Sequence, residues 1–245
     1  MGIELIIAGI LVGGISGFFG VGGGMILVPI LMYLGFDIKE AIGISVIQMV
    51  FSSLYGSFLN YKKGVLKISS TIFFGIGGFV GALGSGFIVH HLSEKTLSYL
   101  FLAVIIFAIY RFFNSSENDL KKPIENRTLY LAIGMMIGMF ATSIGIGGAV
   151  VLTPIMVGFL HHDIKTAVST ALFFVVFSSI SGLISLSSYG YMDYKHGILV
   201  GVSSLIGVYV GIHLAHKTDA KKHKNMILAL YIFVLAMMIN KLLGN

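Results

Sequence analysis

The chain has 245 residues, of which 56% are hydrophobic and only 11% charged, and its formal net charge is +6. Soluble domains carry about 25% charged residues, so this composition excludes an ordinary soluble fold. The absence of cysteine excludes disulfides, iron–sulfur centres and thiol catalysis within the chain. The basic residues lie in short connections between apolar runs, where orientation signals of membrane proteins belong, so the positive charge does not indicate nucleic-acid binding.

Ten apolar segments follow one another along the chain, each with few charged residues. In order, they span 3–19, 24–35, 41–60, 68–91, 96–113, 128–144, 149–160, 166–188, 197–216 and 225–243. A run of about 18 or more apolar residues can cross a bilayer as a helix. The runs are continuous and do not alternate as the strands of a membrane barrel do. We therefore expect an all-α polytopic membrane protein, whose first segment is a membrane helix and not a cleaved signal peptide.

The second and seventh segments hold only about a dozen residues. A helix of that length reaches about half-way through a hydrocarbon core about 30 Å thick. A glycine cluster precedes each of them: Gly20-Val21-Gly22-Gly23-Gly24 in the first half and Gly145-Ile146-Gly147-Gly148 in the second. Each half is therefore expected to contain a short pair of segments broken at glycine.

The two halves of the chain resemble each other at ordered positions. The two glycine clusters match at an offset of 125, and Pro29 matches Pro154 at the same offset. The second half then has one extra residue, so that Asp37-Ile38-Lys39 matches Asp163-Ile164-Lys165 at an offset of 126. One long polar stretch separates the two sets of five segments. The expected organisation is a first membrane repeat over 1–113, a polar linker over 114–127 and a second membrane repeat over 128–245.

Basic residues predict how the chain is oriented in the membrane. Twelve of the sixteen lie on one side, in the loops 62–67, 111–127, 161–165 and 217–224, and four lie on the other. Cytoplasmic loops carry the excess of Lys and Arg, so the linker is expected in the cytoplasm and both termini outside, in the inner cell membrane. Five segments per half place the second repeat upside down relative to the first. Inverted repeats of this kind are typical of transporters that bind substrate near mid-membrane.

The glycine clusters are the best candidates for a substrate site. Glycine lets a ligand approach the main chain, and each cluster precedes a short helix whose first N–H groups lack partners. Such helix N-termini bind anions without a charged side chain. If the clusters lie at the tips of two opposed hairpins, both would face one anion. The candidate glycines are Gly20, Gly22, Gly23, Gly24, Gly145, Gly147 and Gly148.

Close helix packing is the alternative use of glycine in membrane helices, and we favour it for Gly77/Gly81 and Gly207/Gly211. A Walker phosphate loop is excluded, because neither cluster is followed by Gly-Lys-Ser or Gly-Lys-Thr.

Polar side chains inside the predicted spans could complete the site. Gln48 is the one amide well inside a span, and Ser52 and Ser178 occupy matching positions of the two halves. Intramembrane polar groups often mark substrate pathways, although Ser and Thr also bond to their own helix backbone. The other candidate hydroxyls are Ser45, Ser53, Thr142, Ser143, Thr153, Ser169, Thr170 and Ser179.

The charged and histidine residues argue against several other functions. No Asp, Glu, Lys or Arg lies deep in a span, which disfavours a carboxylate proton relay and cation transport. The pairs His90-His91 and His161-His162 fall at opposite membrane faces, so neither a metal site nor a cofactor is expected. His213 lies inside the ninth segment and is a candidate for proton coupling. No nucleophile or acid–base pair is visible, so we do not expect an enzyme.

The stretch from Gly17 to Gly24 with Pro29, echoed by the second cluster with Pro154, resembles the sulfite exporter TauE/SafE family. The resemblance implies an inner-membrane permease for sulfite, sulfonates, sulfoacetate or similar organosulfur anions, often acting in export. The second cluster departs from the first by Ala149 in place of Gly24, which puts equal roles of the two clusters in doubt. The expected mechanism is alternating access around the glycine tips.

The expected partners are a small-molecule anion and the lipid bilayer, and a homodimer is compatible with the sequence. Two other functions stay open at this point. One is transport of another small anion, a cation or an uncharged metabolite. The other is a role outside transport, as a membrane assembly component or a membrane enzyme.

Overall fold

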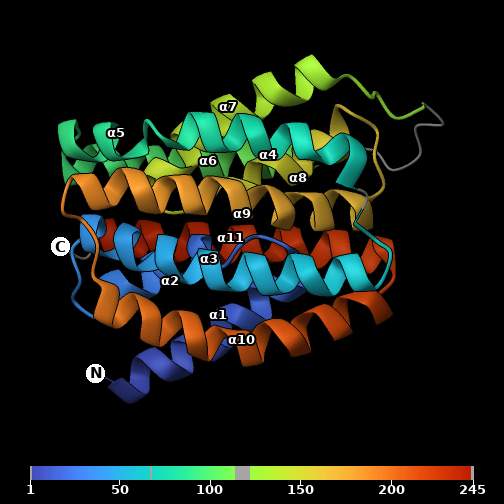
Figure 1. Ribbon diagram of the computed structural model, residues 1–245. Helices are drawn as coiled ribbons and strands as arrows, with labels where there is room; N and C mark the ends of the chain where they lie inside the picture. The colour runs from blue at the N-terminus through green and yellow to red at the C-terminus, as the bar shows by residue number, and fades with distance from the viewer. Residues whose placement is uncertain (1, 67, 114–121, 244–245) are drawn as a thin grey trace.

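The computed structural model describes residues 2–66, 68–113 and 122–243, and these ranges fold into helices connected by short turns (Figure 1). The helices are α1 (Gly2–Phe19), α2 (Gly24–Tyr33), α3 (Ile38–Lys62), α4 (Ile68–Ala82), α5 (Ser85–His91), α6 (Glu94–Phe113), α7 (Arg127–Ser143), α8 (Ala149–Gly158), α9 (Ile164–Ser188), α10 (Tyr194–Lys217) and α11 (Ala220–Leu243). The predicted all-α polytopic class is therefore confirmed, and nine of the ten predicted apolar segments each contain a single helix.

The fourth predicted segment differs from expectation, because 68–91 forms two helices and not one. A turn at Leu83 and Gly84 separates α4 from α5, and the Gly84 N–H bonds to the carbonyl of Gly81 at 3.0 Å. Glycine has a low helix propensity, and hydropathy alone does not register that weakness.

Part of the predicted linker over 114–127 lies outside the described residues. Residues 122–126 run without helix, and the Ile124 N–H bonds to the carbonyl of Leu160 at 3.0 Å. Asn126 then caps α7 by accepting the Leu129 N–H at 3.1 Å.

Seven helical stretches in the described ranges are long and apolar enough to cross a membrane. They are Gly2–Phe19, Ile38–Lys62, Thr71–His91, Glu94–Phe113, Ile164–Ser188, Tyr194–Lys217 and Ala220–Leu243. By contrast, α2 and α8 have ten residues each. At 1.5 Å per residue they extend about 15 Å, half of a typical hydrocarbon core. The chain is thus a membrane protein with several spanning helices and two half-length ones.

The repeated Asp-Ile-Lys motifs begin the two central helices. Asp163 accepts the Thr166 N–H at 2.9 Å and so caps α9. At the matching start of α3, Asp37 and Glu40 form a capping box in which the Asp37 N–H bonds to the Glu40 carboxylate at 3.3 Å. Such caps satisfy N–H groups that a helix start leaves open.

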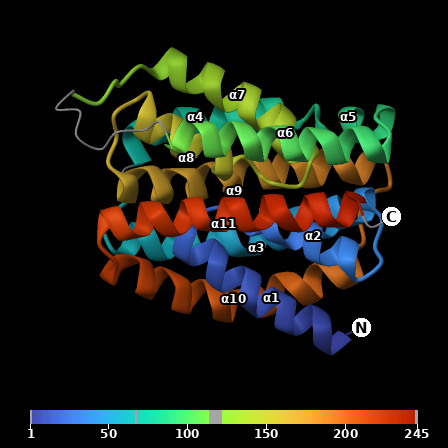
Figure 2. The same ribbon diagram turned by 180° about the vertical axis from the view of Figure 1, so that it is seen from behind.

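Helices α3 and α9 lie against each other in the middle of the molecule and run in opposite directions (Figure 1). The first half contributes α4, which packs on α7 and α9, and the second contributes α10, which packs on α1 and α3. The view from behind shows α11 and α6 beside this central pair (Figure 2). Segments from both halves therefore alternate through the bundle.

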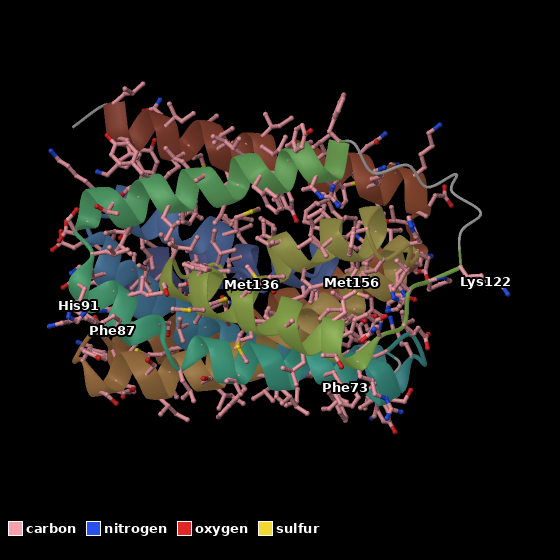
Figure 3. The ribbon with its side chains drawn as sticks, turned by 90° about the horizontal axis from the view of Figure 1, so that it is seen from above. Phe73, Phe87, His91, Lys122, Met136 and Met156 are labelled. Carbon is pink, nitrogen blue, oxygen red and sulfur yellow. The ribbon has the colours of Figure 1, made fainter. Side chains whose placement is uncertain are left out.

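The chain ends mark one end of the bundle and the polar connection marks the other. The N- and C-termini lie at the same end (Figures 1 and 2). His91 lies at this end, and Lys122 lies at the opposite one (Figure 3). We refer to these as the termini end and the linker end.

Glycines allow the closest helix contacts. A Cβ on Gly13 would overlap the carbonyl oxygen of Ser204, and one on Gly207 would overlap that of Ile10, so α1 and α10 touch backbone to backbone. In the same way, Gly77 lies against the carbonyl of Leu131 between α4 and α7. The close-packing interpretation of Gly77/Gly81 and Gly207/Gly211 agrees with these contacts.

This packing predicts different effects for two neighbouring glycines of α1. Gly13→Ala should lower the free energy of unfolding by about 1–3 kcal/mol, the usual cost of overpacking. Gly14→Ala should be neutral or slightly stabilising, because the nearest atoms are 3.8 Å from the added methyl and alanine favours helix. Thermal unfolding of the purified protein in detergent measures both, and equal midpoints would contradict the α1–α10 contact.

Candidate functional site

Both glycine clusters adopt the same backbone path between a long and a short helix. Gly20, Gly22 and Gly23 have φ of 67°, 79° and 84°. Their counterparts Gly145, Gly147 and Gly148 have φ of 73°, 74° and 89°. These torsions strain any residue with a side chain, so three glycines are required at corresponding places in each loop.

Ala149 replaces Gly24 without changing this path. Each is the first residue of its short helix and is not among the residues with positive φ. Alanine therefore fits the backbone of the second loop. The difference between Gly24 and Ala149 affects how closely neighbouring atoms pack and does not change the backbone conformation.

Each loop ends in an open helix N-terminus. The N–H groups of Ile26 and Leu27 bond to the carbonyl of Gly23 at 3.2 and 3.1 Å, which starts α2. The corresponding bonds from Val151 and Leu152 to Gly148 start α8. The N-cap residues Gly23 and Gly148 have no side chain that could cap these helices. The first N–H groups of each helix therefore have no partner within their own helix, at the positive end of its dipole.

The two loops meet inside the protein. A Cβ on Gly24 would overlap the carbonyl oxygen of Gly145, and the Ser45 hydroxyl donates a hydrogen bond to that same oxygen at 2.8 Å. Both loops are fully enclosed by protein. Of the predicted site residues, the structure thus brings the two glycine clusters and Ser45 together.

Ser52 and Ser178 hold the loops from α3 and α9. The Ser52 hydroxyl donates to the carbonyl of Gly22 at 3.3 Å, and the Ser178 hydroxyl donates to that of Gly147 at 2.9 Å. Both hydroxyls also lie 3.4 Å from the carbonyl three residues earlier in their own helices. These serines fix the positions of the two loop carbonyls.

Two apolar side chains fill the space between the loops. A Cβ on Gly22 would lie 3.1 Å from Val175 Cγ1 and 3.6 Å from the Met49 sulfur. A Cβ on Gly147 would overlap the Met49 sulfur and lie 3.2 Å from Val175 Cγ1. Methionine is flexible and adapts to changes in shape, so Met49 is the side chain best able to make room for a ligand.

Gln48 gives the first loop a polar neighbour that the second loop lacks. Its side chain is fully buried, and neither amide atom has a hydrogen-bond partner within the described ranges. A Cβ on Gly23 would lie 2.6 Å from Gln48 Oε1 and 2.9 Å from Nε2. At the matching place in the second half, a Cβ on Gly148 would lie 2.6 Å from Cε1 of Phe174.

An unpaired buried amide costs about 1–3 kcal/mol. Both polar atoms of the fully buried Gln48 amide therefore lack a hydrogen-bond partner within the described ranges, beside the N-terminus of α2. An oxyanion could accept from the amide Nε2 and from the open N–H groups at once. The constellation suits recognition of a small anion by dipoles, without a full positive charge.

The remaining candidate hydroxyls fall into two groups. Ser143, Ser169 and Ser179 bond to carbonyls of their own helices. The hydroxyls of Ser53, Thr142, Thr153 and Thr170 are buried and have no partner in the part of the chain that the structure describes.

Three histidines considered as metal or proton-coupling candidates bond to groups outside the two loops. His91 Nδ1 lies 2.9 Å from the carbonyl of Phe87 at the termini end, and His162 Nε2 lies 2.9 Å from the Tyr130 hydroxyl (Figure 3). His213 Nδ1 lies 2.8 Å from the carbonyl of Tyr209 in its own helix. Among the described residues, no three His, Cys, Asp or Glu side chains are grouped to hold a metal ion.

A groove of about 350 Å³ lies between α6, α7 and α8, on the face that carries Met136 (Figure 3). Its lining is entirely apolar: Ala103, Val104, Phe107, Ile133, Met136, Ile137, Phe140, Ala141, Val151 and Ile155. An anion there would lose its hydration without compensation, so this groove does not suit the chemistry of the loops.

Comparison with known proteins agrees with this architecture. The family model described as "Sulfite exporter TauE/SafE" matches residues 5–238, and the chain belongs to that family. The probable membrane transporter protein YdhB of Bacillus subtilis is 27% identical over 84% of this chain and 87% of its own length. A probable membrane transporter protein of Methanocaldococcus jannaschii is 26% identical over 91% and 90%. No solved structure matches the chain.

The chain is therefore a membrane transporter of the TauE/SafE family. The relatives are named as transporters, which is consistent with the expectation that the chain is not an enzyme.

The unpaired amide predicts an unusual effect on stability. Gln48→Met keeps the volume and removes two unsatisfied polar atoms, so it should raise the free energy of unfolding by about 1–3 kcal/mol. Ser52→Ala serves as the contrast, since it removes a hydroxyl that does bond to the loop and should lower stability. Thermal unfolding in detergent measures both variants. A destabilised Gln48→Met protein would mean that the amide is satisfied by groups other than a ligand.

Proposed function

We propose that this transporter moves small sulfur-containing oxyanions, such as sulfite, sulfonates or sulfoacetate, and that the glycine loops with Gln48 bind the anion. The observation that carries the proposal is the meeting of two uncapped helix N-termini beside a fully buried, unpartnered amide. The family's description names sulfite, which supports the choice of sulfur among small anions.

Export is the direction that the electrical gradient favours. Moving one negative charge out of a cell whose interior is negative releases about 2.3 kcal/mol per 100 mV. Efflux of an anion then needs no coupling ion. The proposed orientation places the linker end in the cytoplasm and the termini end outside, in the inner membrane, in line with the excess of basic loop residues at the linker end.

The two halves are proposed to be inverted repeats that exchange access to the loops. Helices α3, α4 and α6 begin 126 residues before α9, α10 and α11, at 38 and 164, 68 and 194, and 94 and 220. The opposite directions of α3 and α9 support this assignment (Figure 1). Rocking of one half against the other would open the loops to one end of the bundle at a time.

Transport by the chain alone tests the proposed substrate. Proteoliposomes that contain only this protein should pass sulfite down a voltage gradient, and sulfonates should compete. Gln48→Met should reduce that flux at least about tenfold, because a hydrogen bond to a charged group contributes about 1.5–3 kcal/mol. Gly22→Leu and Gly147→Leu should abolish flux, and Gly14→Ala should leave it unchanged. Undiminished sulfite flux in all three site variants would overturn the site, and competition by metal ions or carboxylates alone would point to another substrate.

The orientation can be measured with single cysteines, because the natural chain contains none. His91→Cys and Lys122→Cys place exposed thiols at opposite ends of the bundle (Figure 3). A membrane-impermeant maleimide should label the first in intact cells and the second only after the membrane is opened. The reverse labelling pattern would invert the proposed orientation.

A further inference from the structure

Two backbone carbonyls beside the glycine loops lie where their own helix supplies no donor. Pro154 lies inside α8, and because proline has no N–H, the carbonyl of Val150 loses the bond that residue 154 would otherwise give. Phe18 lies in the last turn of α1, where the final carbonyls have no partner within the helix. Carbonyls inside a membrane need partners from the protein, so both require a donor from another element.

Helix α11 supplies both donors. Tyr231 is fully buried, and its hydroxyl donates a hydrogen bond to the carbonyl of Val150 at 3.1 Å. About two turns earlier on the same helix, His223 Nε2 lies 2.8 Å from the carbonyl of Phe18. A carbonyl only accepts, so the histidine ring carries a hydrogen on Nε2 and donates it here. One helix therefore holds the residue before the first loop and the short helix after the second.

The bond from Tyr231 reaches the second glycine loop through one peptide unit. Val150 is the second residue of α8, and its carbonyl belongs to the same peptide unit as the Val151 N–H. That N–H bonds to the carbonyl of Gly148 at 3.1 Å. The unit is thus fixed by Tyr231 on one side and joined to the loop glycine on the other.

The matching helix of the first half has no such donors. At the offset of 126 residues, Tyr231 and His223 of α11 correspond to Ile105 and Leu97 of α6. Both of these residues are fully buried, and neither side chain can donate a hydrogen bond. The polar support of both loops therefore comes from α11, whereas α6 offers apolar side chains at the matching places.

We propose that Tyr231 and His223 are positioning residues, which hold the two glycine loops in the arrangement that binds the anion. Tyr231 does so by replacing the donor that Pro154 removes from α8. Their effect on transport rests on the proposed function. The hydrogen bond to Val150 and its replacement can be measured without any substrate.

The sequence makes the Val150 carbonyl directly observable. Val150-Val151 and Val175-Val176 are the two places where valine follows valine. Full-length protein with carbon-13 in the valine carbonyls and nitrogen-15 in the valine amides gives carbonyl–amide correlations from these two peptide units alone. Tyr231→Phe removes the hydroxyl and keeps the ring. The Val150 carbonyl signal should then move to lower frequency, because hydrogen bonding deshields a carbonyl carbon, and the Val175 signal should stay in place.

A second substitution restores the missing donor from the backbone. Pro154→Ala supplies an N–H at the place where a regular helix bonds to the Val150 carbonyl. Added to Tyr231→Phe, it should return the Val150 signal toward its natural frequency and recover the thermal midpoint in detergent. Pro29→Ala is the same change in α2 and should restore neither. If Tyr231 only fills space, the two proline variants should not differ.

Transport shows whether this support matters for the anion. In proteoliposomes, Tyr231→Phe should raise the KM for sulfite about fivefold with little change in kcat, because loosely held N–H groups bind the anion more weakly. Pro154→Ala in the same chain should reverse the change. His223→Leu should also raise the KM, without rescue by Pro154→Ala, and His223→Gln, which keeps a donor, should raise it less. Tyr99→Phe, on the exposed face of α6, should have no effect.

The outcomes separate this proposal from the proposed substrate. An unchanged Val150 signal in Tyr231→Phe, or equal rescue by Pro154→Ala and Pro29→Ala, would overturn the positioning role whatever the sulfite flux. An unchanged KM in Tyr231→Phe, with the natural protein transporting sulfite, would overturn it as well. Absence of sulfite flux in the natural protein, together with the shift and its rescue by Pro154→Ala, would overturn the substrate and leave α11 as the support of the loops.

Discussion

The structure depends on one constraint, which is that backbone polar groups inside a membrane need partners from the protein. Continuous helices meet this demand, but the breaks before α2 and α8 do not. These breaks persist because α3 and α9 enclose them and supply Ser52 and Ser178 to the loop carbonyls. The carbonyls of Gly22 and Gly147 thereby have hydrogen-bond partners, and the first N–H groups of α2 and α8 have none within their own helices. In the proposed function, this break in the membrane fold serves as the place where the anion binds.

The same framework carries different chemistry in its two halves. The backbone torsions of the loops agree closely, whereas the side chains around them have diverged. Gln48 stands where the second half has Phe174, and Ser45 bonds to the facing loop where the matching residue is Ala171. Gly24 lies against that loop, and Ala149 shows that a methyl is accepted at the other contact. The first half therefore contributes Gln48 and Ser45 to the candidate site, whereas the second half has apolar side chains at both matching positions.

Much of the fold follows from the sequence because hydrocarbon imposes length and hydropathy on each segment. The ten segments and the two short helices were predictable in this way. The turn at Leu83 and Gly84 was not, because it depends on local helix propensity inside an apolar run. The glycines at positive φ could be proposed from their clustering, and the contrast of Gln48 with Phe174 was available from the repeat offset. Asn60, His216 and His223 come together from three helices, and no spacing along the chain indicates that contact.

The polar lining of one bundle end has a consequence for the resting state of the transporter. Two identical inverted halves would exchange between two conformations related by a two-fold axis in the membrane plane, and neither would predominate because their free energies are equal. At the linker end Asn60 and His223 line a polar pocket, whereas their counterparts at the termini end, Leu186 and Leu97, are fully buried apolar residues. Opening the termini end exposes hydrocarbon surface to water, and opening the linker end does so to a smaller extent. If the two halves exchange as proposed, this difference favours opening of the empty transporter at the linker end, and the bound anion must supply the free energy of that bias in each cycle.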